Sequence, residues 1–214
     1  MAMKTDDLIN AIAEDASASL PSVGTRTVVA LAIGGAVAVA LFTYSLGVRP
    51  DIASALQTWR FDAKLVTTLL CFLAALWATL RLARPDTDQR HGLAALLLPL
   101  LALAIAIGWE LMASPAGTWI TRAVGSNSRL CVTSILIMSI APLAALLVAL
   151  RAGAPRSPAL AGAAAGLLAG GLAATLYAIH CPDDSPLFVA LWYMPAVALI
   201  TLGGAFIGHR VLRW

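Results

Sequence analysis

The segment YAIHCPDDSP, residues 177–186, gathers residue types that could bind a metal or react with an oxidant. It places an imidazole, a thiol and two carboxylates within five positions: His180, Cys181, Asp183 and Asp184. A metal site, a redox switch, one half of a disulfide and a polar membrane turn would all use such residues. Adjacent His and Cys side chains diverge and no ordered zinc spacing is present, which argues against a permanent zinc site. Transient capture of a thiophilic metal is chemically reasonable.

The composition indicates that this segment belongs to a membrane protein. Of the 214 residues, 60% are apolar and only 12% are charged, whereas a soluble domain has about 25% charged residues. Roughly 20 apolar residues in a helix cross the hydrocarbon core, and several stretches of the chain reach that length. The net charge of +3 is too small and too scattered to indicate direct nucleic-acid binding. We therefore expect a polytopic integral membrane protein, held in a lipid bilayer and without a cofactor.

Six hydrophobic segments predict an all-α fold, a bundle of six transmembrane helices, because backbone polar groups in lipid must be satisfied within each segment. The predicted parts are an N-terminal tail, 1–26, six spans at about 27–48, 63–83, 92–113, 130–150, 159–179 and 187–208, and a C-terminal segment, 209–214. Small residues four apart predict close helix packing. They are Ala30, Gly34 and Ala38 on the first span, Gly162, Gly166 and Gly170 on the fifth, and Gly204 and Gly208 on the sixth. Association of the bundle into a homo-oligomer is left open.

The basic residues between the spans predict how the bundle is oriented in the membrane. An even number of spans puts both termini on one side of the membrane. If that side is the cytoplasm, the cytoplasmic basic residues are Lys4, Arg26, Arg81, Arg84, Arg90, Arg151, Arg156, Arg210 and Arg213, and the outer ones are Arg49, Arg60, Lys64, Arg122 and Arg129. This excess favours cytoplasmic termini. Glu110 is the acid within a span, and we expect it to reach water or to pair with Arg122 or Arg129.

This topology predicts that two of the three cysteines lie at the same, outer face, where disulfides persist. Cys131 begins the fourth span, and Cys181 follows the fifth. Three alternatives stay open: a structural disulfide, a reversible switch driven by oxidation or by a soft metal bound to both sulfurs, and unpaired inert thiols. The two aspartates of the turn discourage thiolate formation at Cys181, whereas Arg129 would encourage it near Cys131. Cys71 lies within the second span and is expected to pack as a small apolar residue.

The tail, residues 1–26, has the pattern of a short acidic amphipathic helix. Its signals are Thr5 as N-cap, Asp6 and Asp7 in the first turn, and an apolar stripe that includes Leu8, Ile9 and Ile12. An acidic helix is a poor ligand for anionic lipid, which attracts basic faces. It suits a groove on a basic protein partner better. A leader without a partner is the alternative.

Two stretches also carry a family resemblance. The opening MKTDDLINAIAEDA, residues 3–16, and the segment HCPDDSPLFVALWY, residues 180–193, combined with six spans and Cys131, resemble the NrsF family of membrane anti-sigma factors. These proteins partner extracytoplasmic-function sigma factors in proteobacteria. The resemblance covers essentially the whole chain. One departure is the pair of aspartates after Cys181, where glutamate is also expected, and the acidic character is kept.

The resemblance implies a protein of the bacterial inner membrane whose cytoplasmic tail holds a sigma factor away from RNA polymerase. The tail residues that would bind it are Thr5, Asp6, Asp7, Leu8, Ile9 and Ile12. The resemblance also implies that Cys131 and Cys181 take part in sensing stress, including heavy-metal or oxidative stress. From the chemistry of the residues, both sulfurs could capture a metal transiently, His180 could add a nitrogen ligand, and Asp183 or Asp184 could add an oxygen ligand.

Two other classes are weaker. A membrane thiol oxidoreductase would need a CxxC pair or a quinone pocket, and the sequence contains no CxxC. A small transporter would need ionisable groups near the bilayer midplane, and the spans lack them. We therefore expect a regulator without catalytic residues rather than an enzyme.

Overall fold

The computed structural model describes residues 22–83, 89–153 and 155–213, and within these ranges the chain is helical without strands. Six of its helices are long and apolar enough to cross a membrane: Val23–Ser45, Trp59–Leu82, Arg90–Ala113, Ser128–Leu150, Pro158–Ala178 and Pro186–Val211. The six predicted spans are thus confirmed as long apolar helices. The first begins at Val23, four residues before the predicted start, because the Ser22 hydroxyl accepts a hydrogen bond from the Thr25 N–H and caps it.

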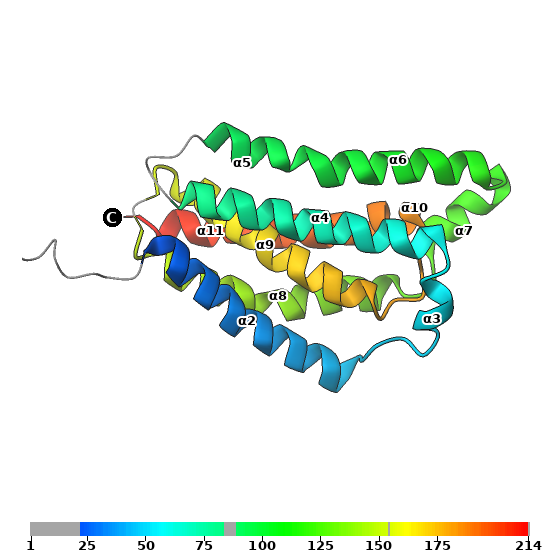
Figure 1. The fold of residues 1–214 in the computed structure, drawn as a ribbon, viewed down its shortest axis with the longest axis horizontal. Coiled ribbons are helices and arrows are strands. Elements are labelled where there is room, and N and C mark those ends of the chain that lie inside the picture. Colours follow the sequence, from blue (N-terminus) through cyan, green and yellow to red (C-terminus); the bar gives the residue numbers. More distant parts are fainter. Residues whose placement is uncertain (1–21, 84–88, 154, 214) are drawn as a thin grey trace, which may run out of the picture.

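Figure 1 shows the helices as a bundle whose described chain ends, residues 22 and 213, lie at the same end. The long elements are α2 (Val23–Ser45), α4 (Trp59–Leu82), α5 (Gln89–Ala95), α6 (Leu97–Ala113), α8 (Ser128–Leu150), α9 (Pro158–Ala178) and α11 (Met194–Val211). The short ones are α3 (Ile52–Ala55), η1 (Ala116–Thr118), α7 (Trp119–Val124), α10 (Pro186–Phe188) and the π-helix η2 (Val189–Tyr193). We call the end that carries α3, α7 and α10 the distal end.

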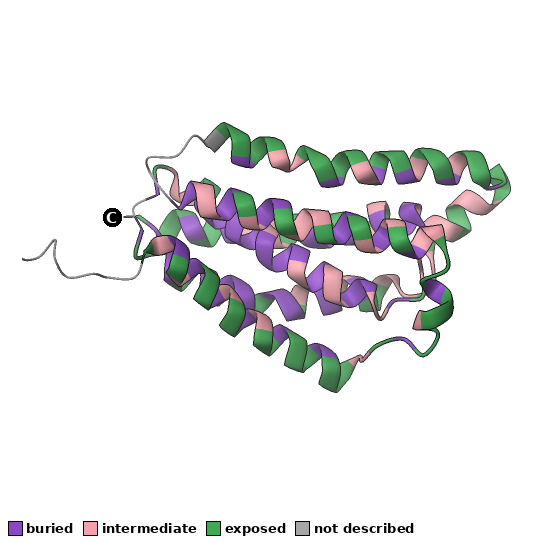
Figure 2. Ribbon diagram, viewed as in Figure 1, coloured by how far each residue is buried: buried purple, intermediate pink, exposed green. Residues whose placement is uncertain are grey.

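Helix α9 forms the centre of the bundle and packs against α11, α4 and α8. Its residues are mostly alanine, glycine and leucine, and most of them are buried (Figure 2). A Cβ atom at Gly208 would lie 2.6 Å from Gly162 Cα, and one at Gly166 would lie 2.9 Å from Thr201 Cα. The backbones of α9 and α11 are therefore in direct contact, as the glycine spacing predicts.

A second glycine contact joins α2 to α8. A Cβ atom at Gly34 would lie 2.6 Å from Pro142 Cα, so only glycine allows this approach. Ala30 and Ala38 are buried on the same face of α2. Pro142 does not break α8, which runs without interruption from Ser128 to Leu150.

Proline changes the helix geometry at two other places. The third span divides at Leu96 into α5 and α6, three residues before Pro99. In the sixth span a π-helical turn, Val189–Tyr193, precedes Pro195. Proline lacks an N–H and its ring clashes with the carbonyl four residues earlier, and a wider π turn relieves that clash. The turn places Val189 and Tyr193 in the buried core.

Candidate functional site

Residues 179–185 at the distal end, which we call the distal turn, connect α9 to α10 and bind several other helices through their polar groups. His180 Nδ1 donates a hydrogen bond to the Gly47 carbonyl at 3.0 Å, just beyond the end of α2. The backbone N–H of Arg49 donates to the Ile179 carbonyl at 3.3 Å. The segment that follows α2 is therefore held against the end of α9.

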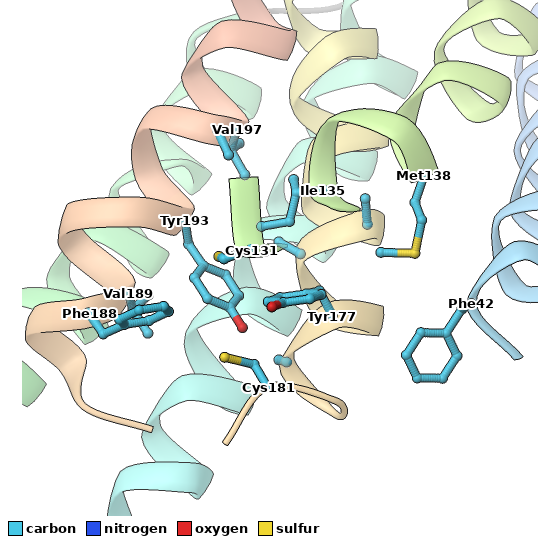
Figure 3. Packing of buried hydrophobic residues seen from close by; sticks show 14 of the residues in the cluster. Phe42, Cys131, Ile135, Met138, Tyr177, Cys181, Phe188, Val189, Tyr193 and Val197 are labelled. Carbon is cyan, nitrogen blue, oxygen red and sulfur yellow. The ribbon is translucent and has the colours of Figure 1, made fainter. Parts of the chain in front are cut away.

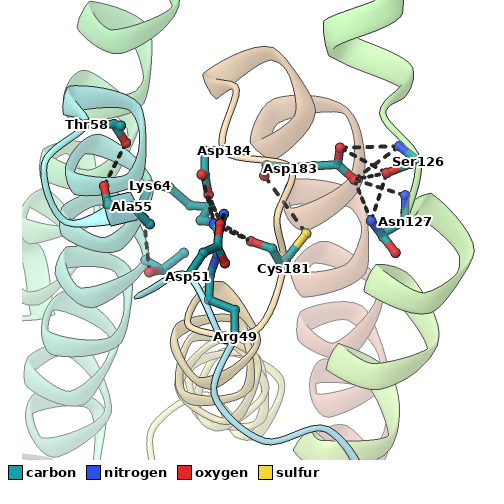
Figure 4. A network of polar contacts seen from close by, with 11 residues as sticks. Arg49, Asp51, Ala55, Thr58, Lys64, Ser126, Asn127, Cys181, Asp183 and Asp184 are labelled. Atoms are coloured by element: carbon teal, nitrogen blue, oxygen red, sulfur yellow. Dashed lines mark hydrogen bonds and ion pairs between the residues drawn. The ribbon is translucent and has the colours of Figure 1, made fainter. Parts of the chain in front are cut away.

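Two buried cations converge on the distal turn (Figure 4). Lys64 of α4 has a fully buried side chain, and its Nζ donates to the Cys181 carbonyl at 2.7 Å and to Asp184 Oδ1. Arg49 Nη1 donates to the same carbonyl at 3.2 Å and to Asp184 Oδ2 at 2.9 Å. Arg49 also forms a bidentate pair with Asp51, which lowers the pKa of that carboxyl. Because two cations face two carboxylates, their burial is electrostatically balanced.

Asp183 binds the start of α8. Its Oδ2 accepts hydrogen bonds from the backbone N–H groups of Ser126 at 3.1 Å and Asn127 at 2.9 Å, and from Asn127 Nδ2 at 3.1 Å. Asn127 is the N-cap residue of α8 but makes no capping bond with its own side chain. The carboxylate from the distal turn therefore caps the entry to α8 through the N–H groups of Ser126 and Asn127, and it places a negative charge at the positive end of the helix dipole.

The approach of Asp183 requires a glycine at position 125. Gly125 has φ of 59°, and a Cβ atom there would lie 2.9 Å from Asp183 Cγ and 2.5 Å from the Phe188 ring. The left-handed conformation and the lack of space both exclude other residues. Cys131 lies one turn into α8, so the helix that carries one cysteine is fastened to the turn that carries the other.

Each polar side chain of the distal turn therefore has a partner with a structural role. The described residues contain no group of three or more His, Cys, Asp or Glu side chains that could hold a metal ion. His180 faces the end of α2, Asp183 faces α8, and Asp184 faces Arg49 and Lys64. Their predicted role as metal ligands beside the thiols therefore finds no support in the geometry, and the sequence pattern did not reveal that each serves a different helix.

The side chains of the two distal cysteines are directed into the protein rather than toward its surface. Cys131 and Cys181 are both fully buried in one hydrophobic cluster (Figure 3). All three cysteines, Cys71 included, are free thiols, so the structure contains no disulfide between α8 and the distal turn. The Cys181 thiol donates to the Asp183 carbonyl at 3.9 Å. Burial raises the pKa of Cys181 and outweighs the opposing effect of Lys64, so this thiol is neutral at rest.

Two tyrosines complete this cluster, and the sequence interpretation missed them. Tyr177 and Tyr193 are buried with ring centroids 5.9 Å apart, and among the described residues their hydroxyls have no hydrogen-bond partner. Both lie beside the Cys181 thiol. One signal was available in the sequence, since Tyr177 precedes Cys181 by only four residues, and the Cys181 N–H donates to the Tyr177 carbonyl at 3.0 Å just beyond the end of α9. Tyr193 reaches the site through the π turn, which only the structure reveals.

Glu110 forms a second buried ionic cluster at the distal end. Its side chain is fully buried and accepts hydrogen bonds from Arg60 Nε at 2.7 Å, Arg122 Nη1 at 3.1 Å and Ser114 Oγ at 3.0 Å. The expected pairing with Arg122 is present, Arg129 is not among the ion-pair partners found for Glu110 in the described chain, and Arg60 was not anticipated. The cluster ties α6 to α4 and α7.

The predicted sigma-factor-binding residues lie outside the described residues. They are Thr5, Asp6, Asp7, Leu8, Ile9 and Ile12.

Comparison with known proteins identifies the family. The model of the NrsF family, described as negative regulator of sigma F, matches residues 12–214. The chain belongs to the NrsF family. It is 37% identical to a protein of Caulobacter vibrioides named anti-sigma-F factor NrsF, over 99% of this chain and 100% of that protein. It is 34% identical to a probable anti-sigma-F factor NrsF of Azospira oryzae, with 99% and 100% covered. No solved structure matches this NrsF-family chain.

Proposed function

We propose that this NrsF-family protein is a membrane-bound anti-sigma factor that sequesters an extracytoplasmic-function sigma factor through its tail, residues 1–26. The observation that carries the proposal is the full-length similarity, 37% over 99% of the chain, to a protein named as an anti-sigma-F factor. The acidic amphipathic pattern of the tail adds a means of binding, because an apolar stripe flanked by acids fits a groove on a basic partner.

The proposed location is the bacterial inner membrane, with both termini in the cytoplasm and the distal end outside. The excess of basic residues at the terminal end supports this orientation. Four of the five basic residues assigned to the outside, Arg49, Arg60, Lys64 and Arg122, are paired with carboxylates at the distal end. Their presence on that side is accounted for by structural ion pairs.

The sensing element we propose is the pair Cys131 and Cys181. A surface cavity of about 360 Å³, lined by Arg60, Arg122, Asp183 and Asp184 among others, adjoins the distal turn and offers a small ion or oxidant a route toward it. An adduct on a fully buried thiol must displace the groups packed around it. Reaction would therefore displace the turn.

Helix α2 offers a direct connection from the turn to the tail. Its distal end is held by the bond from His180 to Gly47, and its first residues, from Val23, are the last residues of the tail. Displacement of the turn would release one end of α2 and shift the equilibrium between two bundle states. The sensor works only if thiol modification stabilises one of these states relative to the other.

Pull-down of the sigma factor tests the tail assignment. Leu8→Glu and Ile12→Glu each place a charge in the apolar stripe and should abolish capture, because a buried carboxylate without a partner opposes docking. Asn10→Glu adds the same charge off the stripe and should retain capture. Full capture by both stripe variants would refute the assignment.

Induction of sigma-dependent genes tests the sensor. Cys131→Ser and Cys181→Ser, singly and together, should abolish induction by heavy metals and oxidants while basal repression is retained. Cys71→Ser is the matched control, since Cys71 lies midway along α4 and outside the distal turn, and should respond normally. If the double serine variant is induced like the unaltered protein, the cysteines are not the sensor.

A further inference from the structure

Within the described parts of the chain, the hydroxyls of Tyr177 and Tyr193 are buried and make no hydrogen bond, which is rare in folded proteins. The Tyr177 side chain is fully buried, and Tyr193 is 2% exposed. An unpaired buried donor is unfavourable, so two of them side by side indicate a state of the site in which they are used.

The group beside them is the thiol of Cys181. Figure 3 shows the Tyr193 hydroxyl pointing toward the Cys181 sulfur and the Tyr177 hydroxyl directed toward the Tyr193 side chain, next to that sulfur. A neutral thiol is a weak acceptor and binds these donors poorly. A thiolate is an anionic acceptor, and hydrogen bonds to charged groups are about twice as strong as neutral ones.

We propose that Tyr177 and Tyr193 are positioning residues that stabilise the Cys181 thiolate, the form in which this cysteine reacts with a thiophilic cation or electrophile. The inference rests on the proposed sensor function and names the groups that control its chemistry. On ionisation the Cys181 S–H loses its proton to water, both phenols keep theirs and donate hydrogen bonds, and the sulfur lone pair then bonds the incoming cation or electrophile.

The charges around the sulfur are consistent with this role. Lys64 Nζ lies on the Cys181 carbonyl and contributes a positive charge from α4. The other titratable or charged groups near Cys181 are Arg49, Cys131, Asp183 and Asp184, while the neighbouring His180 is directed to the Gly47 carbonyl. Arg49 and Asp184 neutralise one another, and Asp183 is occupied by the N-terminus of α8. The two phenols are thus the donors without another partner.

The test measures the reactivity of Cys181 as a function of pH. The full-length protein in lipid nanodiscs carries Cys71→Ala and Cys131→Ala, which leaves Cys181 as its thiol. Its rate of reaction with methyl methanethiosulfonate is followed by intact-protein mass spectrometry. Tyr177→Phe and Tyr193→Phe should each raise the pH midpoint of the rate by about one unit and lower the rate at neutral pH about tenfold.

Tyr44→Phe is the matched control, because Tyr44 is 95% exposed on α2, and its midpoint should not move. Phenylalanine removes only an unpaired hydroxyl, so both core variants should keep or gain thermal stability, which checks that they fold. Unchanged midpoints in both core variants would overturn the proposal. So would a rate altered by the same factor at every pH, because that result indicates packing alone. Capture of the sigma factor is not part of this readout, so failure of the sensor function remains separately measurable.

Discussion

The carboxylate of Asp183 caps α8, accepting a hydrogen bond from the backbone N–H of Asn127 at 2.9 Å. The two residues are 56 positions apart in the sequence and belong to different connections of the bundle. This bond joins the turn that carries Cys181 to the first turn of the helix that carries Cys131. Movement of the distal turn, which carries Cys181, would therefore be transmitted to α8, which carries Cys131.

Removing this cap should destabilise the protein. Asp183→Ala leaves the backbone N–H groups of Ser126 and Asn127, at the entry to α8, without their acceptor and should lower the free energy of unfolding by about 1–2 kcal/mol. Reversible unfolding in mixed micelles measures the change. Asp183→Asn keeps one acceptor oxygen without the charge and should lose less. Equal stability of the alanine variant and the unaltered protein would contradict the capping role.

The stability of the protein should depend on the ion pair between Lys64 and Asp184. Lys64→Met leaves Asp184 with a single cation and should destabilise the bundle by about 3 kcal/mol, since breaking a buried pair leaves an uncompensated charge. Arg129→Met is the control, because Arg129 is exposed. Lys64→Met combined with Asp184→Asn should recover part of the loss, and a purely additive double variant would show that the two residues are not coupled.

The stability of the protein should depend on pH through Cys181. Burial raises the pKa of this thiol above its ordinary 9.0, so the folded protein keeps the proton after the unfolded chain has lost it. This contribution is fully present below the unfolded pKa and is lost as pH rises above it. Between pH 7 and pH 10 the free energy of unfolding should fall more steeply for the unaltered protein than for Cys181→Ala. Parallel curves would contradict this prediction.

The contact between α9 and α11 should tolerate no added methyl group. Gly204→Ala places a Cβ atom about 3.0 Å from Gly166 Cα, and the resulting overpacking should cost about 1–3 kcal/mol in the free energy of unfolding. Gly203→Ala is the matched control on the adjacent residue, where a Cβ atom meets nothing within 4 Å. Similar stability of the two variants would show that the helices separate without penalty.

Several features of this protein could be predicted because they depend on local sequence. The six spans follow from runs of apolar residues, whose backbone polar groups must be satisfied within each helix. The contact of Gly162 with Gly208 follows from small residues at a spacing of four. The placement of Cys131 and Cys181 at one end of the bundle follows from the alternation of spans.

The partners of the distal turn could not be predicted in the same way. His180, Asp183 and Asp184 look like a ligand set in sequence, yet each binds a different helix. The direction of a side chain in a turn depends on the backbone path and on neighbours distant in sequence, so adjacency carries little information about it.

The sequence by itself determined the membrane-spanning class of this protein, its six helices, the small-residue faces and the resemblance to the NrsF family. Only the tertiary structure decided that the thiols are buried, that Lys64 and Arg49 hold the distal turn, and that Tyr177 and Tyr193 surround Cys181. The physical reason is that hydrophobicity and helix periodicity act over a few residues. Burial, ion pairing and side-chain contact arise between segments that only folding brings together.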